Sequence, residues 1–406
     1  VLHIIETLLS LKMISLGFYL KKNNMNLNYC TNCLFPETKP DLSFNEKGIC
    51  SACESAEKKD KDIDWESMKF EFDKIVENYK KDGIGYDCLI PVSGGKDRTY
   101  QAYFMKEVYG MNPLCVCFET TYATDLGNEN LDNISKMGID VIHFKKNHPV
   151  YKSMVVESFK RVGDEMWPNH IGIFTIPVMF AVKLNIPLII WGENSQMEYG
   201  GPDLRSVQSR VLNRKWLEEF GGLLGNRIED MIGVDGITKK ELTPYFYPSD
   251  EDIQRVGVTG LFLGSYFFWD ARKQLEIIKE KGFKVKEDYP VEGTYTNYEN
   301  LDERLVGLHD YLKFVKYGFG RATDHACIDI RNKRMSREEG LNKVVQYDGK
   351  YPHYGVKSFI EYSGLSKQQI DDVIDSFTNP LLFQQDDQGV FARDEDFNLI
   401  PLFKVQ

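Results

Sequence analysis

The stretch that decides the fold is DCLIPVSGGKDRTYQ, residues 87–101. Its first part, from Cys88 to Val92, is a short apolar run of the kind that forms a buried β-strand. Two glycines end the run, and the residues from Arg98 onward are compatible with a helix. A strand, a glycine turn and a helix in this order predict a phosphate-binding loop, because glycines let the backbone approach an anion and a helix N-terminus is electropositive.

The following segments extend this pattern. Apolar runs predict four strands, at residues 86–92, 112–119, 139–144 and 186–192, and predicted helical segments lie between them, at 98–109, 125–137, 150–164 and 171–184. Strands that alternate with helices indicate an α/β fold with a doubly wound parallel sheet, whose ligands bind at the carboxyl ends of the strands. Beyond residue 202 the alternation stops, and the segments predicted to be helical are 203–230, 265–282 and 300–378. The charged stretch 57–66 predicts a linker.

Length and composition bound the class of protein. A chain of 406 residues with 42% hydrophobic and 27% charged residues predicts a globular protein of two or three domains. The formal net charge of −11 argues against nucleic acid as the main partner. The apolar start, residues 1–25, lacks the pattern of a signal peptide and is interrupted by Glu6 and Lys12. It therefore predicts either an upstream extension of the natural start of the chain or a disordered segment, and no attachment to a membrane.

Four of the eight cysteines form two Cys-x-x-Cys pairs. Cys30 and Cys33 make the first pair, Cys50 and Cys53 the second, and sixteen residues separate them. Four thiolates in two close pairs are typical of a structural tetrahedral zinc ion, whose closed sulfur site leaves no position for a substrate. A redox pair or an iron–sulfur cluster is the alternative. This use of cysteine indicates a reducing, cytoplasmic environment rather than a secreted disulfide framework.

The glycine turn matches neither of the two common nucleotide-binding motifs. A Walker loop needs a glycine where this chain has Ile90, and the dinucleotide motif Gly-x-Gly-x-x-Gly is absent. The sequence SGGKD still offers backbone N–H groups, a hydroxyl and a carboxylate, which suit phosphates and a magnesium ion. The alternative is a tight turn without a ligand. The candidate phosphate ligands are Ser93, Gly94, Gly95, Lys96 and Asp97, with Asp97 also the candidate magnesium ligand.

SGGKD resembles the pyrophosphatase loop, or PP-loop, of ATP-cleaving ligases such as NAD synthetase, GMP synthetase and asparagine synthetase. Within that superfamily, residues from about 29 to 380 resemble the N-acetyl sugar amidotransferases of bacterial surface-glycan biosynthesis. The resembling stretches are YCTNCLFPETKPDLSFNEKGICSACE, PVSGGKDRTYQ, WGENSQMEYGG, GTYTNYENLDERLVGLHDYLKFVKYGFGRATDHA and DIRNKRMSREEG. The last three are the most particular. The resemblance implies the adenine-nucleotide α-hydrolase-like (HUP) type of doubly wound sheet.

The resemblance also implies the reaction. ATP is split to AMP and pyrophosphate with the help of magnesium, with Asp97 and Lys96 as candidate catalytic residues. Adenylation of an acetamido oxygen creates a leaving group that ammonia then displaces, which gives an acetamidino sugar in surface polysaccharide or flagellin glycan biosynthesis. The superfamily usually carries a hydroxyl residue after the aspartate, whereas this chain has Arg98 followed by Thr99; both are candidate ATP ligands.

These expectations divide the chain into four parts. They are an extended or disordered start at 1–25, a zinc-ribbon-like module at 26–60, a PP-loop ATP-binding α/β domain at 61–202, and a continuation of the catalytic domain with a helical substrate or partner region at 203–406.

Two further stretches hold candidate ligands of the sugar or nucleotide. WGENSQMEYGG, which follows the fourth predicted strand, offers Glu193, Asn194, Glu198 and Tyr199. A capped helix start with solvated acids is the alternative interpretation. Arg321 and Asp324 are candidates because arginines bind anionic groups, and surface ion pairs are the alternative. His143, His148 and His309 are isolated in the sequence, which predicts packing or surface positions.

The ammonia donor is expected to be a separate protein. Cys30 is assigned to the metal site and no segment resembles a glutaminase domain, so we expect a partner glutaminase and, by resemblance, an ammonia-channelling cyclase-like subunit. Self-association into a homo-oligomer is a further expectation. Two rival functions stay open. One is a PP-loop tRNA-modifying enzyme of the thiolation type, with Cys115 and Cys117 as reactive thiols; the other is a non-catalytic zinc-ribbon scaffold that binds nucleotide.

Overall fold

The computed structural model describes residues 27–81, 83–193, 198, 211–212, 225–287 and 289–405. The predicted extended or disordered start therefore lies outside the described residues, as do Asn194 and Tyr199.

The centre of the molecule is a six-stranded sheet with the order β3-β2-β1-β4-β6-β5. Its strands are β1 (Cys88–Val92), β2 (Pro113–Phe118), β3 (Asp140–Phe144), β4 (Leu188–Trp191), β5 (Val211–Leu212) and β6 (Thr259–Phe262). The first four and β6 pair in parallel, and β5 is an antiparallel edge strand. The predicted doubly wound parallel sheet is confirmed. Its chain order reverses between β1 and β4.

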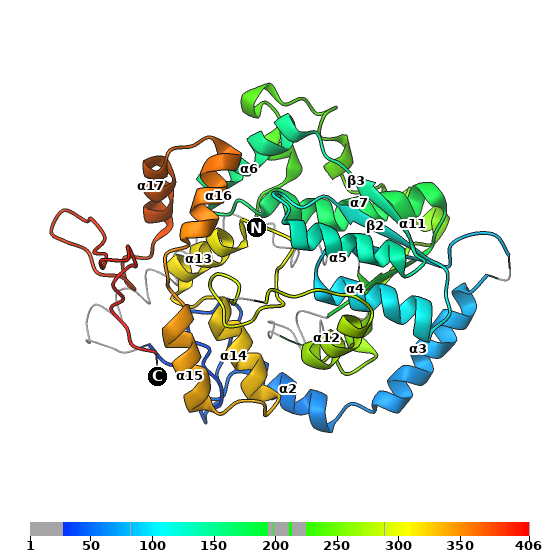
Figure 1. Cartoon of the computed structure of the whole chain (residues 1–406), viewed down its shortest axis with the longest axis horizontal. Helices are drawn as coiled ribbons and strands as arrows, with labels where there is room; N and C mark the ends of the chain where they lie inside the picture. Colours follow the sequence, from blue (N-terminus) through cyan, green and yellow to red (C-terminus); the bar gives the residue numbers. More distant parts are fainter. Residues whose placement is uncertain are drawn as a thin grey trace.

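Hydrophobic cores cover both faces of the sheet, which explains why the central strands β1, β2 and β4 are continuous apolar runs. Cys88 and Ile90 point into one core, whereas Leu89 between them points into the other. The first core includes residues of α3 (Trp65–Tyr79), α4 (Lys96–Tyr103) and α5 (Asp125–Lys136). The second includes residues of α6 (His148–Val162), α7 (Trp167–Leu184), α13 (Val306–Tyr317), α16 (His353–Ser363) and α17 (Lys367–Phe377). Figure 1 shows these C-terminal helices gathered beside α6.

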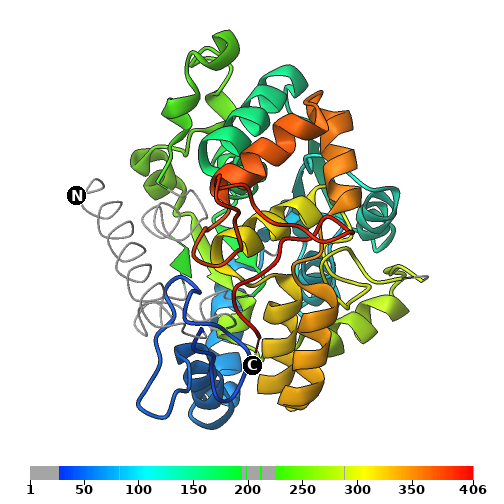
Figure 2. The ribbon, with the colours of Figure 1, turned by 90° about the vertical axis from the view of Figure 1, so that its left-hand side faces the viewer.

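The cysteine-bearing module docks on the C-terminal helices α14 (Arg321–Arg331) and α15 (Arg337–Tyr347), as Figure 2 shows. The Arg337 guanidinium on α15 donates to the Cys33 carbonyl oxygen at 3.0 Å. The Leu34 backbone N–H donates to the sulfur of Cys327 on α14 at 3.3 Å. The module is therefore part of the same packed body as the C-terminal region.

Three predictions about elements were wrong. The first half of the charged stretch 57–66 is not a linker but the end of α2 (Ser51–Lys61), whose last turn carries three lysines that suit a helix C-terminus. Segment 203–230 was predicted to be helical, but its described residues contain β5 and a short 3-10 helix, Ile228–Met231. Strand β6 was missed because four residues including a glycine give too short a signal. Two further helices, α11 (Asp250–Val256) and α12 (Ala271–Glu280), flank it.

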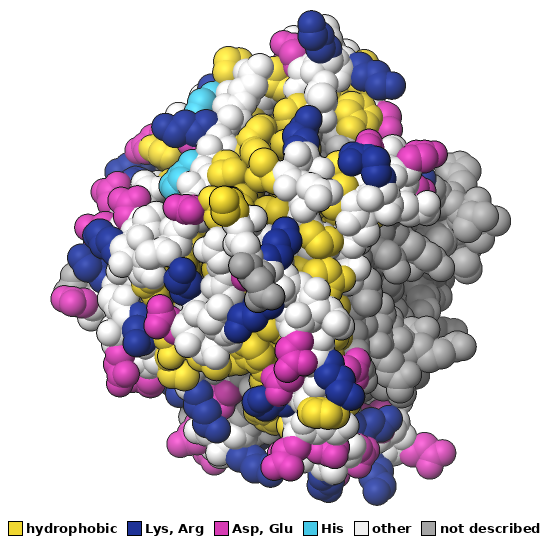
Figure 3. All heavy atoms as spheres, turned by 90° about the vertical axis from the view of Figure 1, so that its right-hand side faces the viewer, with side chains coloured by type: hydrophobic (Ala, Val, Ile, Leu, Met, Phe, Trp, Pro, Cys, Tyr) yellow, Lys and Arg dark blue, Asp and Glu magenta, His cyan; other side chains and the backbone are white. Residues whose placement is uncertain are grey.

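The surface carries charges of both signs. On the face shown in Figure 3, lysine and arginine side chains are interspersed with aspartate and glutamate side chains. Among the described residues, every helix is too short or too polar to cross a lipid bilayer.

Candidate active site and metal centre

The turn after β1 is held by hydrogen bonds between its own residues. Ser93 Oγ accepts hydrogen bonds from the Gly95 backbone N–H at 3.3 Å and from Arg98 Nη1 at 2.9 Å. Because both contacts use lone pairs of the oxygen, the hydroxyl proton of Ser93 remains for another acceptor. Helix α4 begins at Lys96 with Gly95 as an N-cap that has no side chain, so its first N–H groups are not capped by a side chain. Donors in this arrangement can bind an anion.

Close backbone packing explains why the turn contains glycine at position 94. A Cβ atom on Gly94 would lie 2.1 Å from the carbonyl oxygen of Gly127 in α5. A Cβ atom on Gly127 would in turn lie 2.4 Å from Cα of Asp302. The turn, the start of α5 and the segment around Asp302 are therefore stacked backbone against backbone.

A cavity of about 310 Å³ opens beside this turn. It lies at the carboxyl ends of β1 and β4, between which the strand order reverses, and this is the usual ligand position in open α/β sheets. Three groups of residues line it: Pro91, Ser93, Gly95, Lys96, Asp97, Arg98 and Gln101 from the loop and α4; Trp191, Gly192 and Glu193 from the end of β4; Glu299, Asn300, Asp302 and Arg321 from the C-terminal region. Phe174 and Phe262 complete the lining.

Oppositely charged groups meet inside this cavity. Lys96 is buried, and its Nζ lies 2.6 Å from Asp97 Oδ2 and 3.0 Å from Glu299 Oε1. Burial lowers the pKa of Lys96, but the two carboxylates outweigh burial and raise it overall. Burial and the Asp97 carboxylate raise the pKa of Glu193 to about 8. Lys96 is therefore a fixed positive charge, whereas Glu193 exchanges its proton near neutral pH.

The carboxylates of the cavity fit a magnesium ion. Oδ1 of Asp97 is buried and has no hydrogen-bond partner among the described residues, while Oδ2 of Asp97 contacts Lys96. The carboxylates of Glu193, Glu299 and Asp302 line the same cavity. Carboxylate oxygens are the ligands that Mg²⁺ takes alongside substrate phosphates. Asp97 Oδ1 is thus the first candidate ligand of such an ion.

Some of the predicted site residues line this cavity and others lie outside it. The predicted residues that line it are Ser93, Gly95, Lys96, Asp97, Arg98, Glu193 and Arg321. Gly94 and Thr99 lie behind the turn, where the Thr99 hydroxyl donates to the Gly95 carbonyl oxygen at 3.0 Å. Glu198 forms an ion pair with Lys59, and Asp324 forms one with Lys313. Asn194 and Tyr199 lie outside the described residues.

Arg321 reaches the cavity from the start of α14. Its Nη2 donates to Asp310 Oδ1 of α13 at 2.8 Å and its Nε at 3.1 Å. This fork geometry fixes the guanidinium, so that its position depends on α13.

The lining residues that were not predicted include three from the segment before α13: Glu299, Asn300 and Asp302. They lie in the segment 300–378 or just before it, which was predicted to be mostly helical, but residues 293–305 form turns and bends instead. Asn300 has a left-handed backbone, with φ of 50°. The density of acids and asparagines in YENLDE was the available signal, because such residues favour turns over helix interiors.

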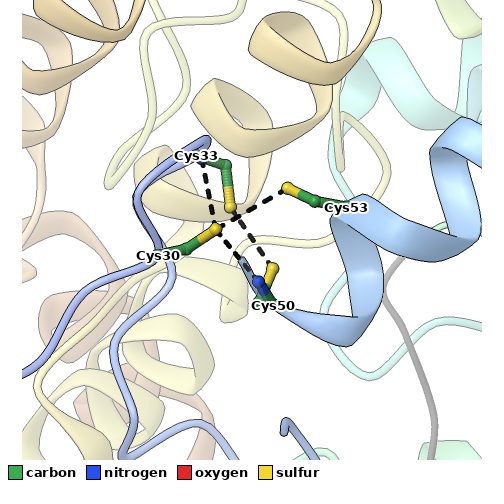
Figure 4. A group of neighbouring side chains, drawn as sticks. All are labelled: Cys30, Cys33, Cys50 and Cys53. Atoms are coloured by element: carbon green, nitrogen blue, oxygen red, sulfur yellow. Dashed lines mark hydrogen bonds between the residues drawn. The ribbon is translucent and has the colours of Figure 1, made fainter. Parts of the chain in front are cut away.

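The four cysteines of the N-terminal module form one compact cluster. Figure 4 shows their sulfur atoms pointing towards one another. The Cys30 and Cys53 sulfurs are 3.8 Å apart, those of Cys33 and Cys50 are 3.6 Å apart, and all four lie within 4.8 Å of one another. Ligands on a tetrahedral ion with bonds of about 2.3 Å to sulfur are separated by roughly 3.8 Å. The predicted cysteine pairs therefore come together as a site that fits one metal ion.

Loss of this metal site is expected to cost much of the stability of the module. A Cys33→Ser variant should lose one equivalent of bound metal per chain and roughly 3–5 kcal/mol of free energy of unfolding, because the module would lose its central cross-link. Elemental analysis and urea unfolding measure the two effects. Cys88→Ala, in a buried strand away from the cluster, is the control and should keep its metal. Unchanged metal content in Cys33→Ser would show that the cluster is not a metal site.

The C-terminal region of the chain is similar to a known protein family. Residues 292–395 match the family model of the LPS biosynthesis protein WbpG-like, C-terminal domain. This match supports the resemblance to the N-acetyl sugar amidotransferases of the PP-loop superfamily. The matched segment includes Glu299, Asn300, Asp302 and Arg321, which form the wall of the cavity contributed by the C-terminal region.

Two further proteins are similar to this chain. The uncharacterized protein MJ1599 of Methanocaldococcus jannaschii is 34% identical over 108 residues, which are 26% of this chain and 38% of that protein. The chain thus matches well under half the length of this relative. The U34-tRNA thiolase NcsA of Methanococcus maripaludis, solved with its 4Fe-4S cluster, aligns with 66% of this chain and 80% of its own at 13% identity and a TM-score of 0.28. A likeness at that level carries no argument about fold or function.

Proposed function

We propose that the protein is an ATP-dependent amidotransferase that forms AMP. Its acceptor is an N-acetyl sugar, nucleotide-linked or acidic, whose acetamido oxygen is adenylated and then replaced by nitrogen from ammonia. The acetamidino product would enter a surface polysaccharide or a flagellin glycan. The single observation that supports this most strongly is the shared cavity: the phosphate-type turn forms one wall, and the segment that matches the lipopolysaccharide-biosynthesis family forms another.

In this proposal the chain mainly positions groups and stabilises charge. The N–H groups at the start of α4, the Ser93 hydroxyl and the Arg98 guanidinium bind the terminal phosphates of ATP. Lys96 adds a fixed positive charge beside them. Magnesium, held by Asp97, would neutralise phosphate charge when bound. The Arg321 guanidinium, which also lines the cavity, would bind an anionic group of the sugar substrate.

The proposed reaction uses the N-acetyl sugar, ATP and ammonia, and its atoms balance in two steps. The acetamido oxygen attacks the α-phosphorus of ATP, the bond to the bridging oxygen breaks, and pyrophosphate leaves. Ammonia adds to the activated carbon, loses a proton to the surroundings, and AMP departs with the former carbonyl oxygen. We propose zinc for the four-cysteine site, where it is structural because all four positions are taken by sulfur. Ammonia would come from a separate glutaminase with a channelling cyclase-like partner.

The burial and the raised thiol pKa values of Cys115 and Cys117 argue against the thiolation alternative. Cys115 and Cys117 are buried in β2. Burial raises the pKa of Cys117 to about 12 and that of Cys115 well above its ordinary value. Since the thiolate is the nucleophile, both side chains are predominantly unreactive thiols at neutral pH.

Exchange of labelled pyrophosphate into ATP tests the proposal. We expect exchange that depends on an N-acetyl sugar nucleotide and, with ammonium chloride as the nitrogen source, a product lighter than the substrate by the difference between O and NH. Exchange stimulated by tRNA instead would favour the thiolation alternative. Tight ATP binding without exchange, over a panel of acceptors, would favour the non-catalytic scaffold.

Arg98 is expected to contribute to ATP binding rather than to obstruct it. Its guanidinium lines the cavity and donates to Ser93, so Arg98→Ser should weaken ATP binding by about 1.5–3 kcal/mol, the value of a hydrogen bond to a charged group. Titration calorimetry with ATP and magnesium measures this. Arg98→Lys should recover only part of the affinity, because lysine lacks the planar fork. Equal or tighter binding by Arg98→Ser would mean that the arginine is an obstacle in the loop.

A further inference from the structure

A second group of potential metal ligands lies away from the ATP cavity, where the loop between α6 and α7 meets α13. Asp164 and Glu165 belong to this loop, His170 to the first turns of α7, and His309 to α13. Ligand atoms of Asp164, Glu165 and His309 all lie within 4.8 Å of one another. This juxtaposition could not be predicted from the sequence, because His309 lies 145 residues after Asp164 in the chain.

Glu165 is the observation that points to a ligand. The residue is 0% exposed, and neither of its carboxylate oxygens has a hydrogen-bond partner among the described residues. A buried carboxylate without donors is strongly disfavoured as an ion unless a cation or a proton accompanies it. The Lys316 ammonium does not provide this hydrogen bond, because its Nζ donates to the carbonyl oxygens of Val162 and Gly163.

His309 and Asp164 have the spacing of two ligands on one ion. His309 Nδ1 lies 3.0 Å from Asp164 Oδ1, to which it is hydrogen-bonded, and His170 Nδ1 lies 3.9 Å from Asp164 Oδ2. Adjacent ligands on an ion with bonds of about 2.1 Å are separated by roughly 3.0–3.4 Å, so the His309–Asp164 pair fits this range and His170 lies just outside it. Asp164 is also oriented by its own contact, since its Oδ1 accepts from the Met166 backbone N–H at 2.8 Å. The side chains of His170 and His309 keep 26% and 25% of their exposure, which leaves a route for an ion from solvent.

The geometry points to a second metal site, in which Asp164, Glu165 and His309, with His170 at its edge, bind a divalent ion. Imidazole and carboxylate ligands suit Zn²⁺, Mn²⁺ or Fe²⁺. Two carboxylates balance the charge of such an ion. This inference is independent of the proposed reaction.

The position of the site suggests what the ion does. It would tie the loop at the start of α7, which packs on the sheet, to α13, which belongs to the C-terminal region. The residue after His309 is Asp310, which holds Arg321 in the ATP cavity. The ion is therefore structural and fixes the helix from which Arg321 is oriented.

Metal analysis of the full-length protein tests the inference. After desalting from buffer with added Zn²⁺ and Mn²⁺, elemental analysis should find two equivalents of divalent metal per chain. Cys33→Ser should lose one of them, and Glu165→Gln and His309→Gln should each lose the other. The control is Glu276→Gln, with a 71% exposed side chain on α12, which should keep both. A single equivalent in the wild type, or a second one that persists in Glu165→Gln, would overturn the site and leave Glu165 as a protonated carboxyl.

Anomalous scattering shows whether a metal ion is bound at this second site without the need for a variant. Crystals of the wild type, measured above and below the absorption edge of the metal found, should show a peak between Glu165 and His309 in addition to the peak at the four cysteines. A map with a peak only at the cysteines would contradict the site, even if Glu165→Gln failed to fold.

Discussion

The Asp97→Asn variant should exchange pyrophosphate into ATP about 10²- to 10³-fold more slowly than the wild type, the effect expected from losing one preorganised charge contact at a reacting group. Asparagine keeps the size of the side chain, and Lys96 keeps Glu299 as a partner, so the fold should survive. The buried Oδ1 of Asp97, which has no hydrogen-bond partner among the described residues, would be converted to a weaker ligand or an amide donor. The magnesium concentration needed for half-maximal exchange should rise as well.

The exchange rate at saturating ATP and varied magnesium measures this effect. Asp132→Asn, an exposed aspartate on α5, is the matched control and should exchange at the rate of the wild type. An Asp97→Asn protein that exchanges within twofold of the wild type, at the same magnesium optimum, would remove Asp97 from the reaction.

The Gly94→Ala variant should lose about 3 kcal/mol of free energy of unfolding and most of its affinity for ATP. The added methyl group would lie 2.1 Å from the Gly127 carbonyl oxygen, and backbone atoms cannot turn aside as a flexible side chain can. The turn or the start of α5 must shift, which moves the N–H donors that we propose bind the phosphates. Urea unfolding and calorimetry with ATP measure the two losses.

Gly83→Ala is the control for this substitution. No atom lies within 4 Å of a Cβ at Gly83, so its stability should change by less than about 0.5 kcal/mol. If Gly94→Ala were as stable as Gly83→Ala and bound ATP normally, the backbone stacking of the turn on α5 would not describe the protein.

Much of the fold was predictable because its signals are local. The run from Cys88 to Val92 has both faces buried, so every residue is apolar, and the glycine turn marks where the strand ends. The spacing of the four cysteines in the sequence is enough to predict their cluster. Strand β6 was not predicted, because a strand of four residues shows little hydrophobic periodicity.

The candidate site was predictable only where its residues are adjacent in the chain. Ser93 to Arg98 form one turn, so their meeting place follows from one stretch of sequence. Glu299 and Asp302 reach the same cavity from about 200 residues away, through backbone stacking on Gly127 that no periodicity reveals. For the same reason the sequence could not show the partner of His309, which was predicted to be a packing or surface residue and which contacts Asp164.

Analysis of the products by phosphorus NMR tests the central claim most directly. Purified protein with ATP, magnesium, an accepted N-acetyl sugar nucleotide and ammonium should release AMP and pyrophosphate in equal amounts, matched by the amidine formed. Formation of ADP and inorganic phosphate would contradict the claim, because the turn from Ser93 to Asp97 would then not bind the pyrophosphate that leaves in an adenylation.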